Sequence, residues 1–148
     1  MEKQPGQSFI RAAGSLGWGF PAALGAKCAL PERPVICFTG DGGLWYHIAE
    51  LETAHRYGIN TVTVVNNNHS LNQVGRGYAG NPGTDALWQF SEDVDLAKVA
   101  QDMGCFGIQV RQPGELKRAL EEALASGKPA LVDVISDVQG MAASPWAG

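Results

Sequence analysis

Runs of apolar residues alternate with helical hydrophobic periodicity along most of the chain. Short apolar or β-branched runs, typical of buried strands, occupy 35–39, 61–65, 106–110 and 130–135. Helical spacing of apolar residues, with helix-start and helix-stop signals, predicts helices over 20–30, 44–57, 95–103 and 113–125. This order predicts an α/β fold, a three-layer sandwich with a mainly parallel sheet and helices on both faces. The carboxyl ends of the strands would share the edge at which such sheets bind ligands.

One polar segment interrupts this alternation, from Asn66 to about Ser91. Its roughly 25 residues exceed ordinary loop lengths, so we expect a functional or partner-contacting segment. The whole chain, 1–148, is interpreted as a single domain with irregular tails over 1–10 and 138–148.

Composition and charge narrow the classes of function. The 148 residues carry a net charge of −4, which argues against a strongly basic nucleic-acid binder. No apolar run approaches the ~18–20 residues of a membrane helix, and the first residues lack the apolar core of a signal peptide. Cys28, Cys37 and Cys105 form no CxxC pair and are expected to be reduced, buried thiols. We therefore expect a cytoplasmic protein with neither a nucleic-acid nor a membrane partner.

Glycine is in excess. It accounts for 19 of 148 residues, about 13 % against a usual ~7 %. The glycines follow no collagen period, and many lie between Gly14 and Gly43. This concentration suggests that the backbone there comes close to a ligand.

Two polar sites follow neighbouring strands at the point where each strand ends. Asp41 follows the run 35–39, and Asn67 and Asn68 follow the run 61–65. One strand–helix–strand unit separates them, so both sites are expected at the same edge of the sheet. Carboxylate and amide oxygens suit Mg²⁺ or Ca²⁺ that completes its shell with phosphate and water.

Two glycines follow Asp41 and add a possible anion site. Gly42 and Gly43 lead into the helix predicted from 44, so exposed backbone N–H groups and the helix dipole favour a phosphate there. Each motif alone is also typical of an ordinary turn. Their joint placement favours a metal site beside an anion site, which is what a diphosphate needs.

These motifs carry a resemblance to a known family. GDGG at 40–43, followed after a helix and a strand by NN at 67–68, resembles the signature of thiamine diphosphate-dependent enzymes. The segment GSLGWGFPAALGA at 14–26 is similar to the cofactor-facing segment of the acetolactate synthase, benzoylformate decarboxylase and benzaldehyde lyase group. The resemblance covers about residues 10–136. It implies a C-terminal cofactor-binding domain, thiamine diphosphate and Mg²⁺ as cofactors, and a 2-oxo acid as the substrate of the full enzyme.

The resemblance also implies roles for single residues. Mg²⁺ would be bound by Asp41, by the Asn68 side chain and by the main-chain carbonyl of Ser70. Leu16 would support the bend of the cofactor, and Gly14 would accept a hydrogen bond from its aminopyrimidine. The full set of implied cofactor-binding positions is Gly14, Leu16, Gly40, Asp41, Gly42, Gly43, Asn68, Ser70 and Leu71.

The activating glutamate of such enzymes has no counterpart in this sequence, so no catalytic residue is assigned. In the family it comes from a separate domain, usually of a neighbouring subunit, and Glu50 and Glu52 are better interpreted as helix-surface or interface residues. The family's first strand and phosphate-contacting loop also have no match, so the fold is expected to be N-terminally incomplete. We expect a partner domain or subunit that supplies the glutamate, a homo-oligomer, and no decarboxylation by the chain alone.

Two alternatives remain open from the sequence. Residues 17–22 fit GxGxxA with Asp41 about twenty residues on, as in a dinucleotide-binding domain, although no strand-like run precedes them. A non-catalytic remnant or assembly module of the same fold is the other, because a missing strand exposes a sheet edge that favours association. The sequence does not distinguish decarboxylation from carboligation.

Overall fold

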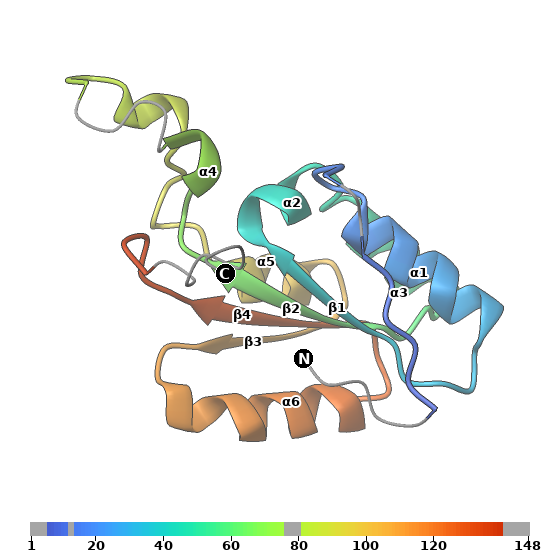
Figure 1. The fold of residues 1–148 in the computed structure, drawn as a ribbon. Coiled ribbons are helices and arrows are strands. Elements are labelled where there is room, and N and C mark those ends of the chain that lie inside the picture. Colours follow the sequence, from blue (N-terminus) through green and yellow to red (C-terminus); the bar gives the residue numbers. More distant parts are fainter. Residues whose placement is uncertain (1–5, 12–13, 76–80, 141–148) are drawn as a thin grey trace.

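Helices and strands alternate in a computed structural model that describes residues 6–11, 14–75 and 81–140 (Figure 1). In chain order the elements are α1 (Gly19–Ala29), β1 (Ile36–Gly40), α2 (Asp41–Trp45), α3 (Glu50–Tyr57), β2 (Val62–Asn67), α4 (Asn72–Gly75), η1 (Asp85–Leu87), α5 (Leu96–Asp102), β3 (Phe106–Val110), η2 (Pro113–Glu115), α6 (Leu116–Ala125) and β4 (Ala130–Ile135).

The four strands form one parallel sheet in the order β1-β2-β4-β3. Gly40, the last residue of β1, pairs with Asn66 of β2, so Asp41 begins the next element beside the end of β2. All strands point the same way (Figure 1), and the turns after β1 and β2 therefore lie at one edge. This edge carries the predicted site.

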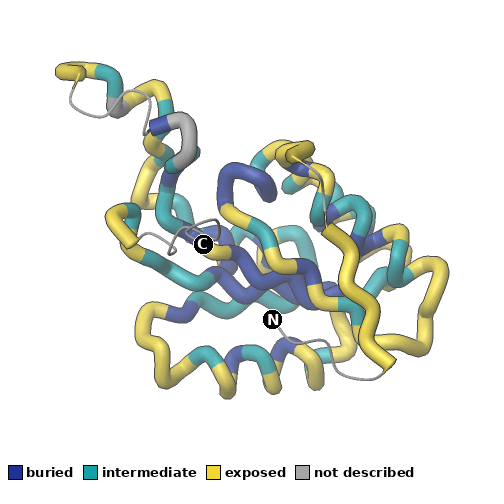
Figure 2. The backbone as a smooth tube through the Cα atoms, in the orientation of Figure 1, coloured by how far each residue is buried: buried dark blue, intermediate teal, exposed yellow. Residues whose placement is uncertain are grey.

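Each face of the sheet has its own core. On one face α1, α2, α3 and α5 bury residues such as Phe20, Leu44 and Leu51. On the other face α6 packs on β3 and β4 through Ala119 and Ala123. Figure 2 shows the buried residues gathered along the strands between these layers. The three-layer α/β prediction is confirmed.

The strand β1 lies at an edge of this sheet, and no strand in the described ranges pairs with its outer side. Ile36 and Phe38 keep 56 % and 75 % of their surface exposed, although they register with the buried Val62 and Val64 of β2. β1 thus presents apolar side chains at an open edge.

The helix predicted over 44–57 is two helices in the structure. It begins three residues earlier because Asp41 and the two glycines form the first turn of α2. Between α2 and α3 the N–H groups of His47, Glu50 and Leu51 donate to carbonyls three residues back, which tightens the chain into turns. Gly58 ends α3 with a left-handed φ of 63°, as its position after the helix predicts.

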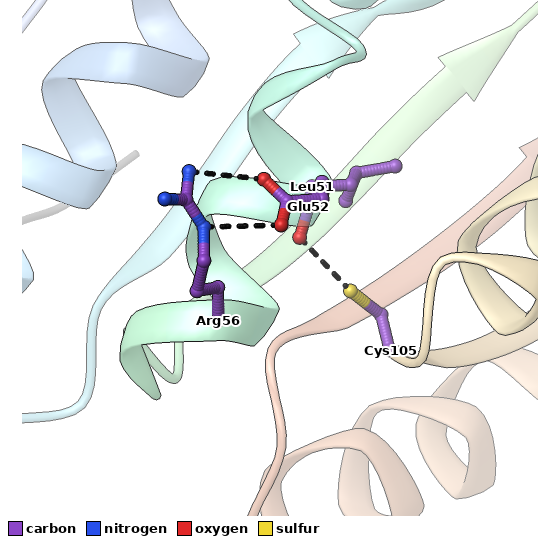
Figure 3. A network of polar contacts seen from close by, with 4 residues as sticks. All are labelled: Leu51, Glu52, Arg56 and Cys105. Carbon is purple, nitrogen blue, oxygen red and sulfur yellow. Dashed lines mark hydrogen bonds and ion pairs between the residues drawn. The ribbon is translucent and has the colours of Figure 1, made fainter.

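The packing of α3 is shown in Figure 3. The Cys105 thiol donates to the carbonyl oxygen of Leu51 at 3.4 Å, inside the core. Glu52 lies on the outer side of the helix and pairs with Arg56 at 3.0 Å, with both side chains 55 % exposed. Glu52 is therefore a helix-surface residue, as expected. Cys37 and Cys105 are buried, but Cys28 is exposed, and the prediction was wrong for that thiol.

The predicted tails are described only over 6–10 and 138–140, where the chain forms no helix or strand. Their remaining parts, 1–5 and 141–148, lie outside the described residues, and the single-domain interpretation of the chain stays a prediction. No helix within the described ranges is long and apolar enough to cross a membrane.

Candidate functional site

The carboxylate of Asp41 connects the ends of β1 and β2. Its Oδ2 accepts a hydrogen bond from the backbone N–H of Ser70, and its Oδ1 accepts one from Gly42, both at 2.9 Å. Asp41 is only 3 % exposed. The two strand ends that the sequence predicts to be neighbours are thus joined through one side chain.

Burial raises the pKa of the Asp41 carboxyl above its ordinary value. The N–H groups of Gly42 and Ser70 and the nearby His69 act in the opposite direction, but they do not cancel the effect. An ionised Asp41 is therefore held at a cost, and a cation bound beside it would relieve that cost.

The two predicted side-chain metal ligands are joined by Ser70. Its N–H donates to Asp41, and its hydroxyl donates to Asn68 Oδ1 at 2.8 Å. The structure therefore brings Asp41, Asn68 and Ser70 together. Asn67 does not contact Ser70 in this way. Its side-chain amide nitrogen donates to the buried Asp133 at 2.9 Å.

The glycines after Asp41 are tightly packed against their neighbours. A Cβ at Gly42 would lie 2.6 Å from Leu71 Cδ2, and a Cβ at Gly43 would lie 2.7 Å from Thr39 Oγ1. The expectation of exposed N–H groups here is wrong, since both glycines are buried in the first turn of α2 and the Gly42 N–H is bonded to Asp41. The glycines let the turn pack closely between Leu71 and Thr39.

The segment that begins at Gly14 lies against this turn. Gly14 and Gly17 have φ of +87° and +89°, which suit glycine, and a Cβ at Gly17 would lie 2.8 Å from Tyr46 Cβ. Leu16 is 56 % exposed, and its Cδ1 is 3.7 Å from the position of a Cβ on Gly43. Leu16 therefore stands beside the glycine turn with more than half of its surface open.

The long polar segment folds back beside the site. The N–H groups of Leu71 and Phe90 donate to the carbonyls of Trp88 and His69, both at 2.7 Å. Phe90 meets Trp45 edge-to-face with ring centroids 6.3 Å apart. Asp41, Asn67 and His69 line a small hollow with Trp45 and Phe90. The described parts of the segment, 66–75 and 81–91, thus lie beside Asp41, and a functional or partner-contacting role for the segment stays a prediction.

Three residues of this region were missed by the sequence reasoning. His69 and Phe90 lie in the polar segment without a recognisable motif. Asp133 could have been found from the sequence, because it is the one charged residue in the apolar run 130–135. A carboxylate that is buried in such a run needs hydrogen-bond partners.

The dinucleotide alternative does not fit this arrangement. Its glycine motif must follow a strand, but residues 14–18 before α1 form none, and β1 comes after that helix. Asp41 is also tied into the turn by two backbone N–H groups, so it is not placed as a free ribose ligand.

Comparisons with known proteins show the family of the chain. The family model described as thiamine pyrophosphate enzyme, C-terminal TPP binding domain, matches residues 1–134. The acetolactate synthase large subunit of Haemophilus influenzae is 41 % identical over 84 % of this chain and 22 % of its own length. The benzoylformate decarboxylase of Pseudomonas aeruginosa is 35 % identical over 89 % of this chain and 25 % of its own.

A solved structure supports the same assignment. The thiamine diphosphate-dependent 4-hydroxybenzoylformate decarboxylase of Rhodococcus jostii RHA1 superposes with a TM-score of 0.70 at 31 % identity, over 82 % of this chain and 23 % of that one. The chain thus spans a quarter or less of the length of these relatives. Thiamine diphosphate with Mg²⁺ is the cofactor pair of the family, as predicted. By its parallel α/β fold and by these matches, the chain belongs to the thiamine pyrophosphate enzymes, as a C-terminal cofactor-binding domain.

Proposed function

We propose that this chain binds the diphosphate of thiamine diphosphate through Mg²⁺ at the joined ends of β1 and β2. It would serve as the cofactor-binding part of a 2-oxo acid decarboxylase or carboligase that resembles acetolactate synthase. The observation that carries the proposal is the contact of Ser70 with both Asp41 and Asn68. It gathers one carboxylate and one amide oxygen at the ends of two strands.

The donor set fits Mg²⁺, which prefers hard oxygen ligands and keeps places for phosphate and water. Asp41 and Asn68 would supply side-chain oxygens, and Ser70 its main-chain carbonyl. No three His, Cys, Asp or Glu side chains of the described residues cluster to hold a metal by themselves. Cation and cofactor are therefore expected to bind together, because the diphosphate completes the shell.

The remaining site residues would shape and orient the cofactor. Gly40, Gly42 and Gly43 would bring the backbone close to the diphosphate, and the Gly14 carbonyl would accept a hydrogen bond from the aminopyrimidine. The half-exposed Leu16 would hold the bend of the cofactor, with Leu71 beside the glycine turn. When bound, thiamine diphosphate supplies the electron sink for breaking or forming the bond next to a 2-oxo acid carbonyl.

Activity would require a second component. No acid or base of this chain is assigned to the aminopyrimidine, and Glu52 is already paired with Arg56 on the helix surface. The activating glutamate is expected from another domain or a neighbouring subunit, in a homo-oligomer. The isolated chain with both cofactors is therefore expected to bind but not to decarboxylate a 2-oxo acid.

A second candidate function is an assembly module of the same fold. The exposed Ile36 and Phe38 at the open edge of β1 favour it, because apolar edge strands associate. In that case the chain would associate through β1 without binding the cofactor.

Calorimetric titration distinguishes the two. The chain is titrated with thiamine diphosphate in Mg²⁺ and in EDTA, and the Asp41→Asn and Glu52→Gln variants are compared. Both changes remove one carboxylate charge, but only Asp41 lies in the site. We expect Mg²⁺-dependent micromolar binding, weakened about 10- to 100-fold by Asp41→Asn, since hydrogen bonds and contacts of charged groups contribute about 1.5–3 kcal/mol. Glu52→Gln should bind as the wild type does.

Binding that is equal in EDTA, or unchanged in Asp41→Asn, would contradict the metal-dependent site. No binding by the folded wild-type chain would contradict the proposal and favour the assembly module.

A further inference from the structure

Asp133 is a buried carboxylate that has no role in the proposed function. It lies in the middle of β4, is 0 % exposed, and is surrounded in sequence by apolar residues. Its Oδ1 accepts from Asn67 Nδ2 at 2.9 Å, and its Oδ2 accepts from Gln109 Nε2 at 3.0 Å. Both of these donors are neutral amides. A carboxylate buried in this way is costly, so its presence calls for a role.

The register of the sheet explains how Asp133 meets these partners. Gln109 of β3 is directly opposite Asp133 across the β3–β4 ladder. Across the β2–β4 ladder Asp133 is opposite Val65, so Asn67 is its diagonal neighbour on the same face. Asp133 therefore reaches from the centre of the sheet toward the turn that follows β2.

The Asn67 side chain, which contacts Asp133, also contacts the turn that follows β2. Its Oδ1 accepts a hydrogen bond from the backbone N–H of His69 at 3.1 Å. His69 has a φ of +53°, the one positive φ of a non-glycine residue in the described ranges. Such a conformation is unfavourable for a histidine and persists only where neighbours hold it. The next residue, Ser70, donates its N–H to Asp41.

The two contacts of Asn67 fix which way its amide points. A carboxylate only accepts, so it requires the Asn67 nitrogen, while a backbone N–H only donates, so it requires the Asn67 oxygen. An amide side chain satisfies both demands in a single orientation. Without the hydrogen bond to Asp133, the orientation of the Asn67 amide is less strictly fixed. The conformation of the turn that this amide holds is then also less strictly fixed.

We propose that Asp133 is a positioning residue, which acts through Asn67 to hold the 67–70 turn in the shape that presents Asn68 and Ser70 beside Asp41. The meaning of this turn as a metal site rests on the proposed function. The positioning itself is a property of the chain without any ligand and is tested separately.

The test exchanges the amide of Asn67 and the carboxylate of Asp133 between the two positions. Asn67→Asp sets two carboxylates against each other, whereas adding Asp133→Asn restores one donor and one acceptor with the same net charge as the wild type. In the double variant the residue at 67 still accepts from His69. Asn60→Asp is the matched control, because it makes the same chemical change at the opposite end of β2, where Asn60 donates to Gly127.

The first readout is hydrogen exchange of the His69 and Ser70 amides, resolved by NMR, in the chain without ligand. We expect exchange at least tenfold faster in Asn67→Asp than in the wild type, with the β3 and β4 amides changed much less. The double variant should recover most of the protection, and Asn60→Asp should leave these two amides unchanged. Where Asn67→Asp does not fold, a folded double variant with wild-type protection supports the inference.

Two results would overturn the inference. One is a double variant that is unfolded or exchanges as fast as Asn67→Asp, because the pair would then not be coupled. The other is exchange that rises equally in β3, β4 and the turn, which a merely structural role of Asp133 predicts.

The second readout is the Mg²⁺ concentration needed for binding thiamine diphosphate. Asn67→Asp adds a negative charge near the site, so electrostatic attraction alone would lower that concentration. Positioning predicts the opposite: a requirement raised about tenfold or more in Asn67→Asp and within threefold of wild type in the double variant. A lowered requirement in Asn67→Asp contradicts positioning. If the wild type binds no cofactor, the proposed function fails, while the exchange experiment still decides the role of Asp133.

Discussion

Leu16 and Leu44 make a paired test of whether the segment before α1 serves the ligand or the fold. Leu16 is 56 % exposed beside the glycine turn, whereas Leu44 in α2 is fully buried. The changes are Leu16→Ala and Leu44→Ala, which remove the same atoms from neighbouring parts of the molecule. If Leu16 supports the cofactor, the two changes should separate binding from stability.

The expected changes in Kd and in the free energy of unfolding follow from the exposed fractions of Leu16 and Leu44. Burying a whole leucine side chain is worth about 1.5–3 kcal/mol. A ligand that covers the 56 % of Leu16 left open would thus gain about 0.8–1.7 kcal/mol, or a roughly 4- to 16-fold lower Kd. The cost of Leu16→Ala to the free energy of unfolding should stay below about 1 kcal/mol. Leu44→Ala should cost about 2–5 kcal/mol, because it leaves a cavity in the core.

Urea denaturation of the ligand-free chain measures the stability change, and titration with thiamine diphosphate and Mg²⁺ measures the Kd. The ligand interpretation of Leu16 is refuted if Leu16→Ala lowers the unfolding free energy by about 2 kcal/mol or more. An unchanged Kd in a stable Leu16→Ala variant refutes it equally. Either result would make Leu16 an ordinary packing residue.

Three further predictions concern the fold. Gly107→Ala should destabilise the chain by about 1–3 kcal/mol or more, because its Cβ would lie 2.0 Å from a backbone oxygen of α5. Gly25→Ala, with open space in α1, should be neutral or stabilising in the same urea titrations. Backbone hydrogen bonds, chiefly from Gln112, lower the pKa of Glu115 below its ordinary 4.5. Glu115→Ala should therefore destabilise at pH 7, and its difference from wild type should shrink as the pH falls below about 4.5; a constant difference in acid denaturation would count against this. A thiol reagent at pH 8 should label the exposed Cys28 but not Cys37, whose pKa burial raises to about 11, until urea is added; labelling of Cys37 in the native chain would show that its burial is incomplete.

The strands were predictable because each is a short apolar or β-branched run of the kind that is typical of parallel sheets. The runs 106–110 and 130–135 coincide with β3 and β4, and those at 35–39 and 61–65 are displaced by one or two residues from β1 and β2. Two neighbouring strand ends in a βαβ unit share an edge by topology, so the meeting of Asp41 with the Asn68 turn also followed from the sequence.

The start of α2 did not follow from local preferences. Two consecutive glycines predict a loop, since glycine is a poor helix former. The helix nevertheless begins at Asp41, where the carboxylate accepts from Gly42 and Ser70, and the glycines allow the turn to pack closely against Leu71 and Thr39. These partners lie up to thirty residues away in sequence, beyond the reach of a local pattern.

The candidate site has two features that a bound ligand would change. Burial raises the pKa of Asp41, so keeping it ionised is unfavourable, and Leu16 leaves apolar surface in water. A cation beside the carboxylate would relieve the first, and the body of an organic cofactor over the leucine would relieve the second. A ligand that carries its own metal-binding diphosphate meets both needs at once. Leu16 Cδ1 lies 3.7 Å from the position of a Cβ on Gly43, in the turn that begins with Asp41. A bound cofactor would account for both features, whereas association through β1 would account for neither, and this favours the proposed binding site over an assembly module.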